Sequence, residues 1–204
     1  MSAPRRYPVP AAAVRVEERI EHSRFITTLE FAGTIDEAKA TIERIRAEFP
    51  DATHHCFAFV IGPPGSTSMT GAGDDGEPAG TAGRPMLKVL LNSGVGDVVG
   101  VVTRWFGGVK LGTGGLVRAY SGGVQRAVRI VNTRERVDLI DARVILEYYA
   151  VDGVRRALNR EGVLIIGEIF GRDVALTLRV PEDRVEDVNR ALADLTNGAV
   201  QLER

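Results

Sequence analysis

The alternation of apolar and polar residues predicts that the chain begins with two strands and an amphipathic helix. Residues 13–20 and 24–31 are rich in β-branched and aromatic residues on either side of a short polar segment, which is typical of a β-hairpin. Thr34 and Glu37 have the spacing of a capping box, in which side chains satisfy free amides at the start of a helix. Apolar residues then recur at helical spacing, so we expect a helix that runs from Thr34 to about Pro50.

A third strand and a long glycine-rich segment are predicted next. Residues 54–61 carry apolar side chains at both alternating sets of positions, as in a strand that is covered on both faces. Residues 62–83 are rich in glycine, proline and carboxylates and have no hydrophobic period, so we expect a long loop without secondary structure. Loops of this kind are usually functional or disordered. Pro85 then suits the first turn of a helix that ends near Ser93.

The pattern of residues 98–134 predicts a strand, a glycine loop and a helix. Residues 98–106 are β-branched and apolar enough for a buried strand, which two glycines end. From Leu116 onward, apolar and small residues recur with a spacing of three and then four, which gives a helix one buried face. We therefore expect this helix to begin in or just after residues 112–115.

The last third of the chain predicts a second domain. Its expected elements follow the order strand, helix, strand, strand, helix, strand, which is the split βαβ arrangement of ferredoxin-like domains. These elements cover residues 142–149, 151–161, 163–170, 174–180, 181–195 and 199–202. We therefore predict an α+β fold, with an N-terminal domain at residues 1–134 and a ferredoxin-like βαββαβ domain at residues 135–204.

Composition changes this picture only locally. The chain has 204 residues and a formal net charge of -1, which argues against a protein that coats nucleic acid over its whole surface. Between Val98 and Arg134, however, there is no Asp or Glu, while six Arg and Lys residues occur. The sequence therefore predicts a local positive field around the glycine loop.

Cysteine content and hydropathy bear on the compartment. Cys56 is the only cysteine, so an internal disulfide is excluded and nothing requires an oxidising compartment. The apolar run near the start is short and interrupted by Pro8 and Pro10, unlike the core of a secretory signal. No run approaches the roughly 20 apolar residues of a membrane span. We expect a cytoplasmic protein without membrane contact.

The residues Gly112, Thr113, Gly114 and Gly115 are the best candidate for an anion site. Small residues leave the first-turn amides of a helix uncovered, and the positive end of the helix dipole favours a phosphate there. The segment matches neither the P-loop nor the dinucleotide fingerprint, because the lysine and the third glycine that these require are absent. A tight turn that only allows close packing of strand and helix remains the alternative.

Cations and aromatic residues flank this loop. Lys110 and Arg118 lie on either side of it, and Arg104 lies near the end of the preceding strand. Trp105 or Phe106 could stack on a nucleic-acid base beside Arg104. Because consecutive residues of a strand alternate in direction, at least one of these two aromatic residues is expected to belong to the core.

Asp74, Asp75 and Glu77 place three carboxylates within four residues of the predicted loop. Such a group is suited to Mg²⁺ binding or to general-base chemistry if a basic partner fixes it. It lacks the regular ligand spacing of an EF-hand. The alternatives are a solvated acidic turn and a carboxylate that docks against the basic stretch and covers the anion site.

His54, His55 and Cys56 are adjacent on a predicted strand. Successive side chains of a strand point to opposite faces, so the three residues cannot all bind one metal ion, although His54 and Cys56 could share a face. No second Cys/His pair accompanies them. We therefore expect no metal site, and we expect Cys56 to be a buried structural residue.

Three motifs are long enough to indicate a family. They are His55-Cys56-x-Ala58, the stretch 74–87 (DDGEPAGTAGRPML) and the stretch 103–120 (TRWFGGVKLGTGGLVRAY). Together they resemble the Impact/YigZ family, with Trp105 where a different aromatic residue, commonly tyrosine, is usual. The resemblance implies an N-terminal α/β domain of the ribosomal-protein type, similar to a domain of the translocation elongation factor. It also implies a ferredoxin-like C-terminal domain that is similar to another domain of that factor.

The resemblance and the charge pattern lead to one functional expectation and one alternative. We expect a translation-associated regulatory or binding protein, without a cofactor and without catalysis, that contacts RNA, the ribosome or a translation-regulatory protein. The expected contacts are Arg104, Trp105, Lys110, Arg118 and the backbone of Gly112, Thr113, Gly114 and Gly115. The alternative is an enzyme that acts on a phosphorylated or nucleotide small molecule, with Asp74, Asp75 and Glu77 holding a metal ion or a proton.

Overall fold

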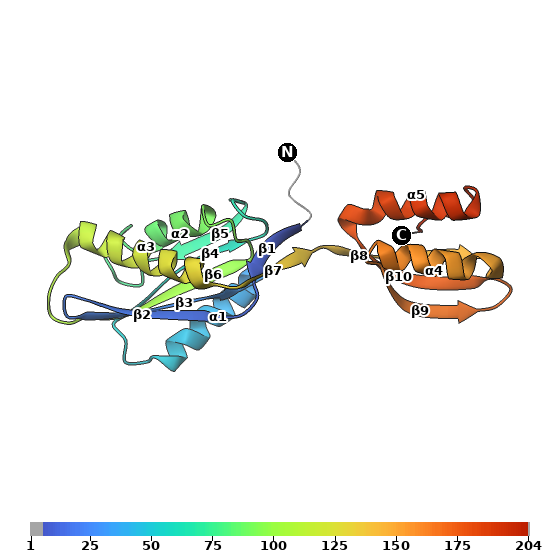
Figure 1. Ribbon diagram of the computed structural model, residues 1–204. Helices are drawn as coiled ribbons and strands as arrows, with labels where there is room; N and C mark the ends of the chain where they lie inside the picture. Colours follow the sequence, from blue (N-terminus) through green and yellow to red (C-terminus); the bar gives the residue numbers. More distant parts are fainter. Residues whose placement is uncertain (1–5, 204) are drawn as a thin grey trace. The chain divides into compact units, whose positions relative to one another are not determined.

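The computed structural model describes residues 6–203, and the chain divides into two compact units, Met1–Arg136 and Val137–Arg204. The fold is of the predicted α+β class (Figure 1). The expectation that the chain has no secretory signal concerns the N-terminal segment, of which residues 1–5 lie outside the described residues. Among the described residues, no helix is both long enough and apolar enough to cross a membrane.

The first unit is built on a five-stranded antiparallel sheet. Its strand order is β2-β3-β6-β4-β5, so the sequence-distant β6 lies at the centre. The strands are β2 (Val14–Ile20), β3 (Ser23–Phe31), β6 (Val98–Trp105), β4 (His54–Ile61) and β5 (Met69–Gly73). The hairpin and the two apolar strands predicted from the sequence are confirmed, and β6 is buried along its length as far as Arg104.

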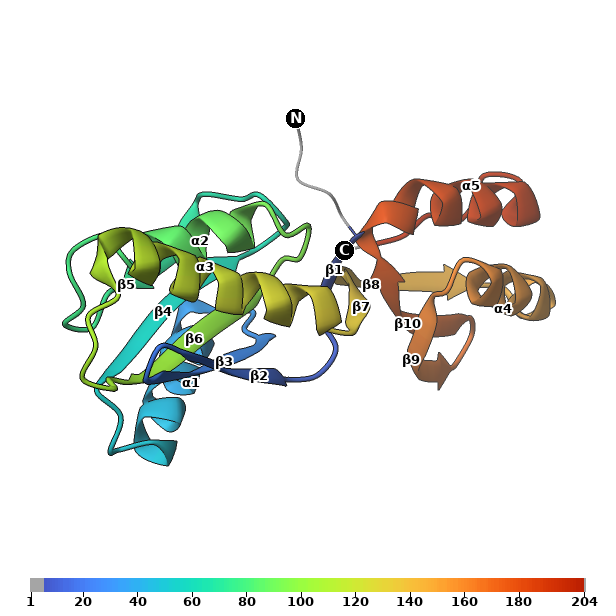
Figure 2. The same cartoon turned by 60° about the vertical axis from the view of Figure 1, so that its left-hand side comes forward.

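Helices cover both faces of this sheet (Figures 1 and 2). The helix α1 (Ile35–Glu48) packs on one face, and α2 (Gly83–Leu91) and α3 (Gly112–Ile130) pack on the other. The predicted capping box is confirmed, because Thr34 Oγ1 accepts the amide hydrogen of Glu37 at 3.1 Å and the Glu37 carboxylate accepts that of Gly33. Each face therefore has its own apolar core.

The prediction of an unstructured loop at residues 62–83 was wrong for residues 69–73, which form the edge strand β5. Two glycines in this strand obscured its pattern in the sequence, and both are required by neighbouring side chains. A Cβ atom at Gly71 would lie 2.3 Å from the Phe59 ring, and one at Gly73 would lie 2.5 Å from the Phe57 ring. Glycine lowers strand propensity, so the packing of two aromatic rings outweighs local preference here.

A short ribbon that the sequence did not indicate joins the two ends of the first unit. The strand β1 (Arg6–Pro10) pairs with β7 (Thr133–Val137), more than 120 residues away. Two prolines in five residues hid β1, since proline has no amide hydrogen for a ladder. Asp97 is fully buried beside the ribbon, where it accepts hydrogen bonds from Tyr7 at 2.8 Å and from Arg136.

The second unit packs two helices on one face of a three-stranded sheet. The strand order is β8-β10-β9, and both pairings are antiparallel. Its strands and helices are β8 (Leu139–Leu146), α4 (Val151–Arg160), β9 (Leu164–Phe170), β10 (Val174–Pro181) and α5 (Val185–Thr196), with short 3₁₀ turns at Tyr148–Ala150 and Glu182–Arg184.

The predicted last strand at residues 199–202 is not formed. Only an isolated bridge joins Glu203 to Arg143. Two backbone amides that would serve a strand are bonded to side chains of α5 instead, because Val200 donates to Thr196 Oγ1 and Leu202 donates to Asn189 Oδ1. The observed order is therefore βαββα, which is the ferredoxin-like arrangement without its final strand.

Candidate functional site

The motif residues meet at one end of the five-stranded sheet. Arg104 on the central strand pairs in register with Phe25 on one side and with His54 on the other. The loop 74–82, which connects β5 to α2, lies against this row of side chains and brings Glu77 to it. Four segments of the sequence thus supply one cluster.

Glu77 is the centre of this cluster. Its Oε1 atom accepts hydrogen bonds from Arg104 Nη1 at 2.5 Å and from the Tyr120 hydroxyl at 2.6 Å. The side chains of Glu77 and Arg104 are each only 4% exposed. A pair of this kind is held by Coulomb attraction in a low-dielectric interior, and losing one partner leaves an uncompensated buried charge. The acidic loop therefore docks on the basic stretch, as one of the two structural alternatives proposed.

Arg104 is buried and is not an exposed cation. Its Nη2 atom donates to Ser23 Oγ at 3.1 Å, and its guanidinium carbon lies 5.3 Å from the centre of the Phe25 ring and 5.4 Å from that of the Phe106 ring. Its Nε–H has no acceptor among the described residues. A nonlocal partner, Glu77, decides its environment, and no local pattern could reveal that.

Asp74 fixes the loop to the start of α2. Its carboxylate accepts backbone hydrogen bonds from Gly80 at 2.7 Å, from Ala82 at 3.0 Å and from Gly83 at 2.8 Å. Burial alone would raise the pKa of Asp74, but these three amides outweigh it, so the pKa lies below its ordinary value. Asp74 is therefore an acceptor for helix amides, in the manner of a cap.

Asp75 has hydrogen-bond donors that differ from those of Glu77 and Asp74. It accepts the His55 amide at 2.6 Å and the Arg46 guanidinium at 3.2 Å. The carboxylates of Asp74, Asp75 and Glu77 thus accept hydrogen bonds from three different sets of donors and do not converge on one point. Among residues 6–203, no group of three His, Cys, Asp or Glu side chains is placed to hold a metal ion.

The two histidines lie on opposite faces of β4, as strand alternation requires. His55 is buried on the α1 side with Nε2 3.1 Å from the Phe49 carbonyl oxygen, and burial lowers its pKa. His54 lies on the other side, where its Nδ1 is 2.8 Å from the Asp75 carbonyl oxygen and its Nε2 is 3.8 Å from Glu77 Oε1. A carbonyl oxygen only accepts, so Nδ1 of His54 carries a proton.

Cys56 and Tyr120 are fully buried parts of the cluster. Burial raises the pKa of the Cys56 thiol to about 12, and its Sγ lies 3.0 Å from the Asp74 carbonyl oxygen. Burial also raises the pKa of Tyr120, so its hydroxyl stays protonated and donates to Glu77. Both groups therefore stay protonated near neutral pH.

Trp105 lies on the opposite side of the sheet from Arg104, so the two residues do not form one stacking surface. Its Nε1 donates to Asp51 at 3.0 Å, its ring packs edge-to-face on Phe49, and the Arg24 guanidinium lies 4.7 Å from its centre. Phe106, one residue later, is 45% exposed on the Arg104 side. The exposed aromatic residue beside the motif is therefore Phe106.

A cleft of about 400 Å³ opens between the acidic loop and the start of α3. Pro78, Phe106 and Leu111 form walls, and His54, Glu77 and Arg104 line its inner part. Lys110, Gly112 and Thr113 are exposed at its α3 side. Gly112 has a left-handed φ of 69°, and no side chain caps the helix. The predicted anion loop and the docked acidic loop thus both line one cleft.

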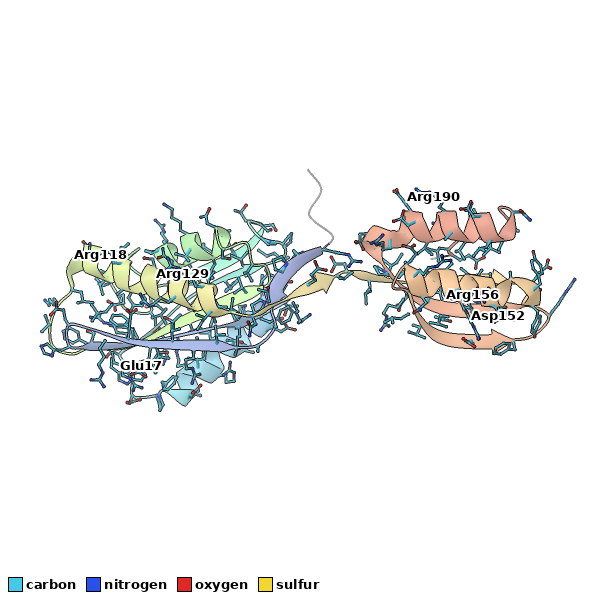
Figure 3. The ribbon with its side chains drawn as sticks, in the orientation of Figure 1. Glu17, Arg118, Arg129, Asp152, Arg156 and Arg190 are labelled. Carbon is cyan, nitrogen blue, oxygen red and sulfur yellow. The ribbon has the colours of Figure 1, made fainter. Side chains whose placement is uncertain are left out.

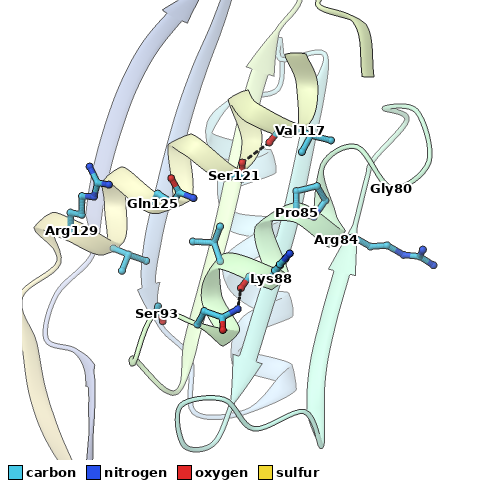
Figure 4. A pocket seen from close by; sticks show the side chains of 12 residues that line it. Gly80, Arg84, Pro85, Lys88, Ser93, Val117, Ser121, Gln125 and Arg129 are labelled. Atoms are coloured by element: carbon cyan, nitrogen blue, oxygen red, sulfur yellow. Dashed lines mark hydrogen bonds between the residues drawn. The ribbon is translucent and has the colours of Figure 1, made fainter. Parts of the chain in front are cut away.

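A second, larger groove of about 820 Å³ lies between α2 and α3 (Figure 4). Lys88 and Arg84 line it from α2, and Ser121, Gln125 and Arg129 line it from α3. Arg118 lies further along α3 in the direction of its N-terminus (Figure 3), where it lines a different pocket together with Lys110 and Glu18. We call the surface around the α2–α3 groove the α2–α3 basic face; it consists of Arg84, Lys88, Gln125 and Arg129.

The sequence did contain a signal for Arg84 and Lys88, which the predictions missed. Asp97 is the sole acidic residue between Pro78 and Arg134, and it is fully buried. The acid-free region is therefore longer than the stretch that begins at Val98, and it includes all of α2. Among the described residues, none of the three cations of the α2–α3 basic face has a side-chain nitrogen within 4.0 Å of a carboxylate oxygen.

The motif residues lie within a segment that matches a known protein family. Residues 21–128 match the Impact N-terminal domain, and residues 144–199 match a domain of unknown function, DUF1949. The IMPACT family member YigZ of Escherichia coli K12 is 44% identical over 194 residues, which cover 95% of each chain. The IMPACT family member YvyE of Bacillus subtilis is 38% identical and covers 88% of this chain. A crystal structure of a hypothetical protein aligns with 97% of this chain and 96% of its own, at 43% identity and a TM-score of 0.71.

Proposed function

The chain belongs to the Impact family, and we propose that it is a translation-associated protein that binds RNA through the α2–α3 basic face. The association with translation rests on the family resemblance. The binding rests on the surface, whose exposed cations lie on two neighbouring helices that carry no carboxylate.

The contrast between the two helical layers of the first unit carries this proposal. The helix α1, on the other face of the sheet, mixes four acidic residues with three basic ones and forms ion pairs. The helices α2 and α3 together contain Arg84, Lys88, Arg118, Arg126 and Arg129 and no acid. Only Arg126 of these five forms an ion pair among the described residues, with Glu18 of β2. One face therefore has an unneutralised positive field and the other does not.

The groove between the two helices is suited to a phosphate backbone. Lys88 and Arg129 supply charge from its two sides, and Ser121 and Gln125 add neutral hydrogen-bonding groups (Figure 4). Phosphate contacts of this kind give affinity without reading the base sequence. We therefore propose binding that depends strongly on salt and weakly on sequence.

A pair of charge reversals tests the proposal. Lys88→Glu with Arg129→Glu should weaken binding of a single-stranded 20-nucleotide RNA, measured by fluorescence anisotropy at several salt concentrations. If each cation meets one phosphate, the slope of log affinity against log salt should fall by about 1.4, since each lost contact removes about 0.7. Co-sedimentation with ribosomes over the same salt range extends the test to the ribosome.

The control has the same change of charge at other places. Lys39→Glu with Arg156→Glu alters exposed residues of α1 and α4, and it should leave RNA affinity and the salt slope nearly unchanged. Equal weakening by both double variants would mean that net charge alone matters. No weakening by either, or binding to a translation-regulatory protein but not to RNA, would reject the proposal.

A further inference from the structure

We propose that the cleft between the acidic loop and α3 binds one nucleoside monophosphate unit, with its phosphate at the start of α3 and its base against Phe106. The unit belongs either to a free mononucleotide or to the 5′ end of an RNA chain; in the second case the inference rests on the proposed RNA binding and specifies one of its sites.

The cleft has the size and lining of a small-molecule site. Its volume of about 400 Å³ lies within the range of roughly 300–1,000 Å³ that such sites occupy. Pro78, Leu111 and Leu116 form apolar walls, and the polar groups gather at the floor and at the α3 side. An apolar slot with polar groups at defined places suits a ligand that has a flat ring and one charged end.

The charged end is assigned to α3. The first turn of α3 has no acidic residue and no side-chain cap, and Gly112, Thr113 and Gly114 are exposed there. Lys110 lies at the same side of the cleft and forms no ion pair among the described residues. Free amides, the positive end of the helix dipole and a lysine together favour a phosphate.

Arg104 gives a second and independent indication of a ligand. It lines the floor of the cleft with a side chain that is 4% exposed, and its Nε–H lacks an acceptor among the described residues. Buried donors in native proteins almost always have a partner, and among the residues that line the cleft Arg104 has a buried side-chain donor without one. Arg104 also fixes Phe106, because its guanidinium lies 5.4 Å from the centre of that ring.

Phe106 and His54 define the base end. The Phe106 ring is 45% exposed although it lines a cleft, and a base can cover this exposed surface by stacking. His54 is oriented by the bond from its Nδ1–H to the Asp75 carbonyl oxygen, and Nε2 is its remaining polar atom. Nε2 can therefore pair with the edge of a base.

Titration of the wild-type chain with AMP, GMP, CMP, UMP, adenosine and inorganic phosphate is the test. Isothermal titration calorimetry should detect the monophosphates, and both adenosine and phosphate should bind at least tenfold more weakly. In an amide NMR spectrum, the resonances of Gly112 to Gly115 should shift with monophosphates. No binding of any monophosphate, or equal binding of phosphate and AMP, would overturn the inference.

Variants separate the two ends of the ligand. Phe106→Ala should weaken AMP binding about tenfold or more, as expected for a lost stack, and should leave phosphate binding unchanged. Lys110→Ala should weaken both. Val109→Ala is the control, because Val109 is 40% exposed next to Lys110 but does not line this cleft. Loss of phosphate binding in Phe106→Ala would contradict the assignment of the base to this ring.

A 5′-phosphorylated and a 5′-hydroxyl RNA of the same sequence distinguish the sources. A preference for the phosphorylated RNA that Lys110→Ala abolishes, with lower affinity for that RNA in Phe106→Ala, assigns the cleft to an RNA end. Equal binding of both RNAs together with AMP binding assigns it to a free nucleotide. AMP binding without any RNA binding would leave this inference standing and reject the proposed function. RNA binding without AMP binding and without an effect of Phe106→Ala would reject this inference and leave the proposed function standing.

Discussion

The two units bury different kinds of side chain. In the first unit, Glu77, Arg104, Asp97 and His55 are all buried with hydrogen-bond partners. In the described part of the second unit, Thr196 is the only buried polar residue, and ion pairs such as Arg155–Glu168 and Arg179–Asp141 lie at the surface. The core of the second unit is therefore built almost entirely from apolar side chains.

The difference indicates where function is located. A buried ion pair is often no more stabilising than apolar residues of the same volume, so its presence is weak evidence of a role in stability. In the first unit, the pair Glu77–Arg104 lies at the floor of the cleft and next to the anion loop. This placement supports the proposal that the polar interior of the first unit shapes a binding surface. The three predictions below test this contrast between the two units.

The largest expected effect comes from breaking the buried pair. Glu77→Ala leaves the Arg104 charge unpaired in the interior, and we expect the first unit to lose about 3–5 kcal/mol of unfolding free energy. Trp105 is the only tryptophan and belongs to this unit, so its fluorescence during urea unfolding reports the change.

Glu168→Ala is the matched control in the second unit. It removes a carboxylate that forms a surface ion pair with Arg155, and the expected loss is below about 1 kcal/mol. A loss of similar size for both variants would mean that the two units do not differ in the way described. Glu77→Leu with Arg104→Met should recover part of the stability while removing the cleft floor.

The second prediction concerns the apolar core of the second unit. Leu178 is fully buried in the middle of the central strand β10, and Leu178→Ala should cost about 2–5 kcal/mol through lost burial and a residual cavity. Because each unit has a core of its own, the far-UV circular dichroism transition of the second unit should move while the Trp105 transition stays in place. A parallel shift of the Trp105 transition would show that the units unfold together.

The smallest expected effect is a pH dependence that only the first unit has. All three histidines lie in this unit, and burial lowers the pKa of His55. The unfolded chain therefore binds a proton at His55 at a higher pH than the native chain does. Stability should fall as the pH is lowered below the unfolded value of about 6.5.

Urea unfolding followed by Trp105 fluorescence between pH 7 and pH 5 measures this effect. His55→Gln should flatten the pH profile, whereas the exposed His22→Gln should leave it unchanged. The transition of the second unit should be flat over this range in all variants. A His55→Gln profile as steep as that of the wild type would reject the assignment to this residue.

Periodicity predicted the elements whose contacts are local. The hairpin β2–β3, the capped helix α1 and the start of α3 were all readable, because their signals lie within one turn or one strand pair. The edge strand β5 was not predicted, because its glycines are required by the close approach of aromatic rings on β4 and do not favour a strand locally. The pair β1–β7 was hidden because no local pattern encodes a partner more than 120 residues away.

The candidate site was predictable in its members but not in its geometry. The motifs identified Glu77, Arg104 and Lys110 as one group, and the structure brings them to one cleft. Sequence gave no means to tell that Arg104 would be buried and that Lys110 would be exposed. The residue type determines the charge of a side chain, whereas the solvation of that charge depends on contacts between distant segments.

The buried Asp97 has a consequence for how the first unit can be studied in isolation. Its three recorded donors are Tyr7, the amide of Gly62 and Arg136, which come from the beginning, the middle and the end of the unit. A fragment cut to the family match at residues 21–128 retains only Gly62 of these. It would keep every residue of the cleft and yet carry a desolvated carboxylate with two of its donors removed. The smallest piece suited to dissection therefore has to include both β1 and β7.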